Sequence, residues 1–409
     1  MWTAQQHITT SNNVLLTTAT LSAVYVGWRV ISGMYSQRIV DSALDKQGLH
    51  TPPSTLPMLG NTLDALFFQK ERFWDWMTEQ SNLSGGRPWV LRLVGRPTTL
   101  VCTSPETLED IFKTHFDTFE RGADLRDLLY AFFGDGIVGA DGENWLKQRR
   151  AAIHMFTTRT LRDVMDTVVK EKTLQLRDVL MKCSEEGRIV DMKSMFGKFS
   201  SDTFTKIAFG VDLNGLSDDV NAGLDHPFNA AVEVMAEEIK EKLPSLVSGQ
   251  IDVPTMDDLQ ELPYLEAVVK ESLRLHAIAT TRVPNKSVTL SDGTFVLQGC
   301  AVMMPAYATA RLKSVWGEDA SEYKPERWLD PETGKVKSVS PFKFGTFISG
   351  PRQCIGMRFA LLEMRIATAV LFSRFDLKTV SDPAEITYEY SFTLPIKGPL
   401  DVSVQRISL

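Results

Sequence analysis

The fold of this chain is decided by residues 347–356, which read Phe-Ile-Ser-Gly-Pro-Arg-Gln-Cys-Ile-Gly. Two glycines and a proline predict a tight loop that leads into a helix. Cys354 lies at the exit of this loop, where backbone N–H groups and the helix dipole stabilise a thiolate. Arg352 adds positive charge, and Gly356 allows a flat group to approach the backbone. A thiolate held in this way can be the axial ligand of a heme iron.

This segment closely resembles the cysteine-ligand loop of cytochromes P-450, which runs Phe-x-x-Gly-x-Arg-x-Cys-x-Gly. All five fixed positions are present, as Phe347, Gly350, Arg352, Cys354 and Gly356. At ordinary residue frequencies, chance gives this pattern in a chain of this length about once in ten thousand cases. The alternative, an inert buried cysteine in a glycine-rich turn, is therefore disfavoured. The resemblance implies that Cys354 binds the iron of heme b and that the other four residues belong to the heme pocket.

Two further motifs agree with this resemblance. Glu271-Ser-Leu-Arg274 places a carboxylate and a guanidinium one helical turn apart, although solvated helix faces often carry this pattern. Pro-Glu-Arg327-Trp follows it, and the family joins the Glu and Arg of the first motif to the Arg of the second. The resemblance implies that Glu271, Arg274 and Arg327 form a buried network that braces the cysteine loop. Such a network is stable only if every charge in it is paired.

The same resemblance indicates which residues would bind the heme propionates. Trp145 and Arg149 have i, i+4 spacing, which places an indole donor and a guanidinium on one helix face. They match the family's Trp-x-x-x-Arg helix, which hydrogen-bonds a propionate; the alternative is a core tryptophan beside a surface arginine. Arg282, just after the Glu-x-x-Arg helix, resembles another propionate partner, and Arg352 would be a further one.

The chain departs from the family in the segment that activates oxygen. There the family carries Ala/Gly-Gly-x-Asp/Glu-Thr on a long central helix over the heme. The nearest string here, Ala222-Gly-Leu-Asp225, is followed by His-Pro, and a proline there would break the helix. Trp145 and Glu271 are only 126 residues apart, roughly half the family's usual spacing. We therefore expect an internal deletion of distal or central helices near residues 231–235, and no catalytic residue is identifiable.

Composition narrows the class of protein. The 409 residues are 43% hydrophobic and 23% charged, which excludes a disordered chain and leaves enough residues for a large core. The formal net charge of −7 argues against a nucleic-acid-binding surface. The four cysteines lie far apart and the six histidines are scattered. Neither a disulfide scaffold nor a cysteine-rich or histidine-rich metal site is therefore expected.

The N-terminal residues have a composition of their own. Residues 8–28 carry no charge, and Arg29 and Arg38 follow them. This pattern predicts a membrane anchor whose downstream side stays in the cytosol, and the alternative is a surface-lying helix or a signal peptide. We expect an anchor and linker in residues 1–50 and a heme domain in residues 51–409. The resemblance implies the endoplasmic reticulum membrane, with the catalytic domain facing the cytosol.

The remaining pattern predicts a mainly α-helical fold with small β-sheets. Strands are expected at residues 89–94 and 98–101, in a hairpin at 288–297 and in a tail at 386–407. A mainly helical region is expected at residues 104–210, with a cap at Ser104, and further helices at 264–275 and 356–372.

One motif points to a different class of protein. Residues 134–139 read Gly-Asp-Gly-Ile-Val-Gly, which matches a dinucleotide-binding pattern. That site needs a strand before the glycines, whereas residues 125–133 have a helical pattern. We therefore interpret these residues as the loop before the Trp145 helix and disfavour a nicotinamide-dependent dehydrogenase.

The resemblance implies a cytochrome P-450 fold with an internal deletion and the activity of a heme-thiolate monooxygenase. Such an enzyme inserts one oxygen atom from O2 into a C–H bond of a lipophilic substrate, with electrons from an NADPH-dependent reductase. Residues 119–149 most resemble the fatty-acid-hydroxylating branches, which indicates a long-chain fatty acid and omega-hydroxylation. An acidic reductase could dock on a basic face formed by Lys147, Arg150, Lys343 and Arg358. The alternative is that these four residues are ordinary solvated charges. The alternative is a catalytically inactive heme-binding or truncated product that lacks the oxygen-activation helix.

Overall fold

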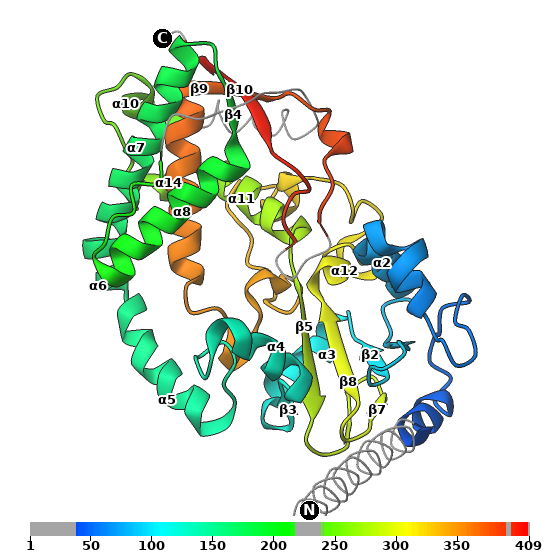
Figure 1. Ribbon diagram of the computed structural model, residues 1–409. Coiled ribbons are helices and arrows are strands. Elements are labelled where there is room, and N and C mark those ends of the chain that lie inside the picture. The colour runs from blue at the N-terminus through cyan, green and yellow to red at the C-terminus, as the bar shows by residue number, and fades with distance from the viewer. Residues whose placement is uncertain (1–37, 217–238, 240, 390–393, 408–409) are drawn as a thin grey trace, which may run out of the picture.

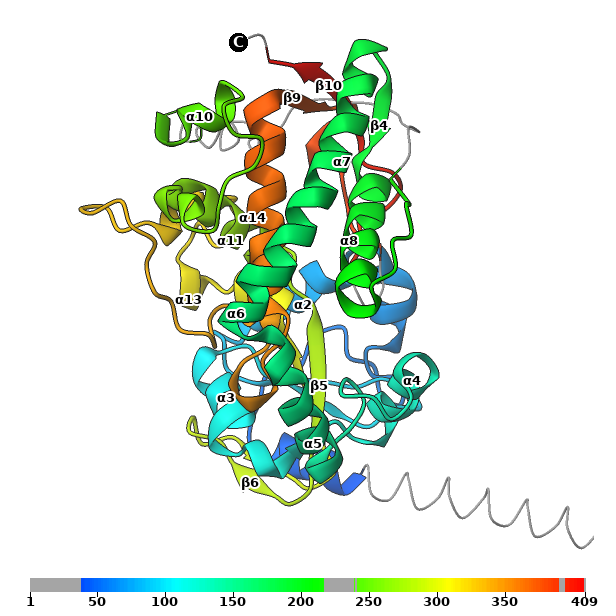
Figure 2. The same ribbon diagram turned by 90° about the vertical axis from the view of Figure 1, so that its left-hand side faces the viewer.

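The chain folds into a helical part and a part built around a five-stranded sheet (Figure 1). The structure is a computed structural model, and it describes residues 38–216, 239, 241–389 and 394–407. Helices α7, α8 and α14 form the long axis of the helical part, and Figure 2 shows them running side by side. The cysteine loop lies at the end of α14 that is nearer to the sheet (Figure 1).

The helices differ widely in length. The longer ones are α2 (Phe73–Leu83), α4 (Ala123–Phe133), α5 (Gly142–Ile153), α7 (Asp166–Glu185), α8 (Met192–Phe209), α11 (Pro263–Leu275) and α14 (Met357–Arg374). The short ones are α3 (Pro105–Glu109), α6 (Thr158–Thr160), α10 (Pro244–Val247), α12 (Ala306–Ala310) and α13 (Lys313–Trp316). A π-helical turn, Asp110–Thr114, continues α3 directly.

The strands form three sheets. The five-stranded sheet has the order β1 (Trp89–Leu91), β2 (Thr99–Val101), β8 (Ala301–Pro305), β5 (Ala279–Pro284) and β3 (Phe119–Glu120). Its pairs are antiparallel except for β2 with β8, which is parallel. The second sheet has the order β4 (Ile189–Asp191), β10 (Asp401–Arg406) and β9 (Phe375–Thr379). The third is a hairpin of β6 (Val288–Thr289) and β7 (Phe295–Val296).

The core of the helical part fixes α14, the helix that carries the cysteine loop. Leu362, Ile366 and Val370 on one side of α14 are buried against a cluster that includes Leu265 and Val268 of α11. Burying apolar side chains of this size stabilises a fold by about 1.5–3 kcal/mol each. The N-terminal end of α14 is therefore held in a fixed place relative to α11, and the cysteine loop with it.

Many expectations from the sequence are confirmed. The fold is mainly helical with small sheets, and β2, the hairpin, α11 and α14 lie within about two residues of the expected ranges. The strand β1 starts at the expected residue but ends at Leu91, before the expected end at residue 94. Ser104 caps α3, because its hydroxyl accepts a hydrogen bond from the backbone N–H of Thr107 at 3.3 Å. Residues 134–139 form the loop between α4 and α5, as interpreted, and a helix rather than a strand precedes them.

The region 104–210 is mainly helical, as expected, and the short strands β3 and β4 interrupt it. One expectation needs correction. The tail 386–407 is not rich in strands: among its described residues there is only β10 and an isolated bridge between Tyr388 and Ile396. The physical reason is pairing: a strand forms where partner strands lie beside it, as β4 and β9 do beside β10, and a local pattern does not reveal the partner.

Two other expectations fall on residues that the structure does not describe. The apolar stretch 8–28 and the expected deletion site at 231–235 both lie outside the described ranges. Within those ranges, none of the helices has the length and the apolar content required to cross a bilayer.

Candidate functional site

Cys354 is the most accessible thiol of the chain. It lies between a short 3-10 turn, Gly350–Arg352, and the start of α14. Its backbone N–H donates to the carbonyl oxygen of Phe347 at 2.8 Å, which closes the loop. Its side chain is exposed, whereas Cys102, Cys183 and Cys300 are buried. A thiolate that binds a metal must be accessible to the group that carries the metal. Of the four cysteines, only Cys354 meets that condition.

The two glycines of the loop differ in the space around them. Gly350 has a φ of +69°, and a Cβ at this position would lie 2.0 Å from the carbonyl oxygen of Phe112. Only glycine therefore lets the loop pack against the π-helical turn Asp110–Thr114. A Cβ on Gly356 would meet Cys354 Sγ at 4.0 Å, which is ordinary contact. The same Cβ would lie 3.9 Å from Phe156 Cε1, so the ring of Phe156 also lines this side of the loop.

Three arginines from three different segments gather near the cysteine loop and form what we call the arginine cluster: Arg121, Arg282 and Arg352. Arg352 donates to the carbonyl oxygen of Ala140 at 2.9 Å, forms an ion pair with Asp141 and lies over the ring of Trp145. Arg282, on β5, is buried and lies over the ring of Phe112.

The arginine cluster carries an excess of positive charge. The pKa of Arg282 is lowered to about 9, because the side chain is buried and because Arg121 and Arg352 add positive charge. Burial also lowers the pKa of Arg352 to about 10, and it lowers that of Arg121. In all three cases the charge of Asp141 opposes the shift.

The cluster fits a ligand with two carboxylates. Arg282 Nη2 and Arg121 Nε are buried and have no hydrogen-bond partner among the described residues. Orphaned charged donors are costly inside a protein unless a ligand pairs with them. Three arginines and one aspartate leave a net charge of about +2, which equals the charge that two propionates of a heme would neutralise. The donor set and the exposed thiol therefore match the groups by which heme b is held.

Helix α5 brings the predicted Trp145 and Arg149 to the same region. Trp145 is buried, and the guanidinium of Arg352 lies 4.4 Å from its ring centroid. Burial lowers the pKa of Arg149, and the charge of Cys354 acts in the opposite direction, so the two side chains are close. Among the described residues, Arg149 forms no hydrogen bond with the arginine cluster. Arg149 therefore lies on the same helix as Trp145 and within electrostatic reach of the thiol.

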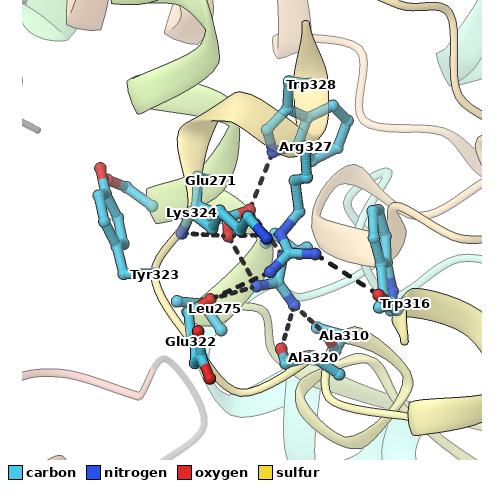
Figure 3. Close-up of polar contacts among 12 residues, drawn as sticks. Glu271, Leu275, Ala310, Trp316, Ala320, Glu322, Tyr323, Lys324, Arg327 and Trp328 are labelled. Carbon is cyan, nitrogen blue, oxygen red and sulfur yellow. Dashed lines mark hydrogen bonds and ion pairs between the residues drawn. The ribbon is translucent and has the colours of Figure 1, made fainter. Parts of the chain in front are cut away.

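Glu271, Arg274 and Arg327 form one buried network (Figure 3). Arg274 Nε donates to Glu271 Oε2 at 2.7 Å, and Arg327 Nε donates to Glu271 Oε1 at 2.8 Å. Trp328 Nε1 and the backbone N–H of Lys324 also donate to this carboxylate, each at 2.9 Å. Burial alone would raise the pKa of Glu271, but these hydrogen bonds and charges hold it below its usual value.

Contacts connect this network to the cysteine loop. The ring of Trp328 packs edge-on against Phe344, with centroids 5.1 Å apart, and Phe344 packs against Phe347 at 6.3 Å. The hydroxyl of Thr346 donates to the carbonyl oxygen of Leu273 in α11 at 2.7 Å. The arrangement can therefore hold the loop against α11, as the resemblance implies.

Sequence reasoning missed two residues of this site: Arg121, which belongs to the arginine cluster, and Asp141, which is its counter-ion. Asp141 and Arg121 stand in no recognised motif, although Asp141 directly precedes the first helical residue of α5 and could have been noted as a cap. Arg121 has no sequence signal, because it follows a two-residue strand and only the fold brings it to Arg282.

Comparisons with known proteins show which family the chain resembles. The cytochrome P450 family model matches residues 51–243 and 232–400. The chain is 26% identical to Cytochrome P450 CYP94D108 of Paris polyphylla, covering 87% of this chain and 93% of that protein. It is 25% identical to Cytochrome P450 94B3 of Arabidopsis thaliana, covering 87% and 92%. It is also 25% identical to Cytochrome P450 704C1 of Pinus taeda, covering 85% and 90%.

These alignments are longer than the chain itself. The one with the Paris polyphylla protein has 477 positions, whereas this chain has 409 residues, so the relative has residues for which this chain has none. The two segments matched by the family model together cover far more than half of the sequence, including the cysteine loop, the Glu271 network and the arginine cluster. The chain therefore belongs to the cytochrome P450 family.

Proposed function

We propose that this chain binds heme b with Cys354 as the axial ligand and acts as a heme-thiolate monooxygenase. Heme b is the cofactor of the family. The observation that carries the proposal is an exposed thiol at the start of α14, next to an arginine cluster with net charge of about +2. We assign the propionates to Trp145, Arg149, Arg282 and Arg352, and the bracing of the loop to the Glu271 network.

The proposed reaction inserts one atom of O2 into a C–H bond of a lipophilic substrate. Its balance is RH + O2 + NADPH + H⁺ giving ROH + H2O + NADP⁺, with the two electrons delivered by a reductase. When bound, heme b supplies the redox-active iron for this chemistry. A long-chain fatty acid is the proposed substrate, because residues 119–149 resemble the fatty-acid-hydroxylating branches.

The proposed partners are a membrane and an NADPH-dependent reductase. The uncharged stretch 8–28 supports an anchor in residues 1–50 and a heme domain in residues 51–409 that faces the cytosol from the endoplasmic reticulum. Arg150 and Arg358 are exposed and Lys343 is half-buried, while the side chain of Lys147 is 77% exposed. Accessible positive charges of this kind support docking to an acidic surface.

A second candidate function is heme binding without efficient turnover. The observation that favours it is the absence from the sequence of the acid–threonine motif of the central helix. Two findings support an internal deletion near residues 231–235. The family model matches in two segments that meet at residues 232–243, and the aligned relatives are longer than this chain.

The first experiment is the absorption spectrum of the full chain, expressed with heme supplied, after reduction and addition of carbon monoxide. We expect the red-shifted Soret band of a thiolate-ligated iron, and we expect Cys354→Ala to lose it. Cys183→Ala is the matched control, because that buried thiol cannot reach a ligand. Absence of heme uptake by the unmodified chain would contradict both candidate functions. Turnover of fatty acids with a reductase then distinguishes the monooxygenase from the inactive heme protein.

A further inference from the structure

The arginine cluster has a single carboxylate in direct contact with it among the described residues. Asp141 Oδ1 pairs with Arg352 Nη2, and Asp141 Oδ2 accepts the backbone N–H of Arg121 at 3.1 Å. Glu120 also acts on the charge of Arg352, but it is exposed and its carboxylate accepts a hydrogen bond from Asn285 at 3.0 Å. Asp141 is therefore the main internal counter-ion of three guanidinium groups.

Helix capping does not explain the position of Asp141. It precedes the first residue of α5, where an aspartate side chain usually accepts an N–H of the first helical turn. Here the side chain makes no such capping hydrogen bond. Both of its oxygens serve Arg352 and Arg121 instead, which links the cysteine loop to the start of α5.

We propose that Asp141 is a place-holder anion for the heme carboxylates: it keeps the arginine cluster compensated before they bind, and it competes with them afterwards. The inference rests on the proposed function, because it takes the ligand of the cluster to be the propionates of heme. No bond is made or broken in this role. Asp141 acts through Arg352 and Arg121 and is thus a positioning residue.

Two consequences follow from the repulsion of like charges. Without the negative charge of Asp141, three clustered arginines repel one another, so the protein without porphyrin becomes less stable. The two carboxylates of a bound ligand would then offset this repulsion. They would therefore stabilise the variant more than they stabilise the unmodified protein, in which Asp141 already offsets part of it. By thermodynamic linkage, the same substitution must strengthen the binding of that ligand.

The test uses Asp141→Asn in the full chain, which removes the charge and keeps the shape. We expect a lower melting temperature without porphyrin. We also expect the variant to bind metal-free protoporphyrin IX about three- to tenfold more tightly than the unmodified chain does. The fluorescence of the porphyrin measures this binding. The matched control is Glu143→Gln on the same helix, because the side chain of Glu143 is 90% exposed and its nearest cation, Lys147, is 3.9 Å away. That variant should behave as the unmodified chain does.

A second probe separates charge from shape. Protoporphyrin IX dimethyl ester lacks the two carboxylates, so Asp141→Asn and the unmodified chain should bind it equally well. Equal gains for the acid and the ester, or weaker binding of the acid by the variant, would overturn the proposal. If the unmodified chain binds neither porphyrin, the competition is overturned. The proposed function is judged separately by the carbon monoxide spectrum, because a metal-free porphyrin offers Cys354 no iron to bind. The counter-ion role is then overturned as well if Asp141→Asn leaves the melting temperature unchanged.

Discussion

Glu271 shows how a fully buried charge is made tolerable at the scale of one residue. Its two oxygens accept hydrogen bonds from Arg274, Arg327, Trp328 and the backbone of Lys324. Arg274 in turn donates to backbone carbonyl oxygens, including that of Ala320 at 2.7 Å. Burying a charge costs several kcal/mol unless such partners compensate it. The network therefore stabilises the fold only as a complete set.

Replacing one member tests this dependence. We expect Glu271→Gln to lower the free energy of unfolding by about 3–5 kcal/mol, because two arginines would remain buried with no carboxylate between them. Urea denaturation followed by circular dichroism measures the change. Glu261→Gln is the control, since Glu261 is exposed and substitutions at such sites usually change stability by less than about 0.5 kcal/mol. Similar losses for both variants would contradict the role assigned to the network.

Glu363 is a buried carboxyl of a different kind, because none of the cations that the structure describes forms an ion pair with it. It lies on α14, its Oε1 has no hydrogen-bond partner among the described residues, and burial raises its pKa to about 7. A hydrogen bond from Thr203 of α8 opposes this shift. In an unfolded chain a glutamate has a pKa of about 4.3, so between these two values the folded protein binds the proton more tightly.

The pH dependence follows from this difference. Because the folded state holds more protons than the unfolded state, the free energy of unfolding should fall as pH rises from about 4.3 to about 7, and then level off. Glu363→Gln cannot titrate, so its stability relative to the unmodified chain should increase over this range by a few kcal/mol at most. Urea denaturation at pH 5, 6, 7 and 8 measures it, with the exposed Glu332→Gln as control. Parallel curves for the unmodified chain and Glu363→Gln would refute the prediction.

At the scale of elements, the cysteine loop depends on its fit against the turn Asp110–Thr114. We expect Gly350→Ala to destabilise the protein by more than about 3 kcal/mol, because a Cβ would lie 2.0 Å from the carbonyl oxygen of Phe112. Gly334→Ala is a close control: its φ is +66°, near the +69° of Gly350, but it has open space around its Cβ position. It should cost only the backbone strain, about 1 kcal/mol. Thermal unfolding of both variants measures the difference, and equal losses would show that packing against Phe112 contributes nothing.

The elements also show what the sequence could predict. The cysteine loop, α11, α14 and the β6–β7 hairpin are recognisable because each carries its signal within a few consecutive residues. The strands β5 and β8 were not predicted, although both lie in the middle of the five-stranded sheet. The parallel pairing of β2 with β8 joins residues about 200 positions apart, which no local pattern reveals.

Local patterns were also insufficient to predict the whole of the site. Motifs identified Cys354, Glu271 and Arg327, which lie in conspicuous short patterns. Arg121 and Asp141 could not be found in this way, because their importance comes from the charge of the side chains around them. That environment exists only when α5, β3 and β5 are assembled around the cysteine loop. A cluster of charges, unlike a motif, is a property of tertiary structure.

At the scale of the whole molecule, the proposed function raises the question of what would cover the face of a bound heme opposite Cys354. A helix that crosses a domain of this size needs about 30 residues to span roughly 45 Å. Among the described residues the longest helix is α7, with 20 residues, and it packs against α14 and α8. The relatives align over more positions than this chain has residues. These facts support a site that is less enclosed than in those relatives.

An open site has a measurable consequence for the proposed reaction. Enclosed active sites exclude water and prevent loss of reactive oxygen species, so we expect this chain to release part of its reducing equivalents as hydrogen peroxide. With heme, a reductase and a long-chain fatty acid, the ratio of peroxide formed to NADPH consumed should be higher than in a variant whose site is enclosed. The control is a chimera that carries, at residues 231–235, the residues that Cytochrome P450 94B3 has and this chain lacks. The chimera should form less peroxide and more hydroxylated product; efficient hydroxylation by the unmodified chain would refute the idea that its site is open.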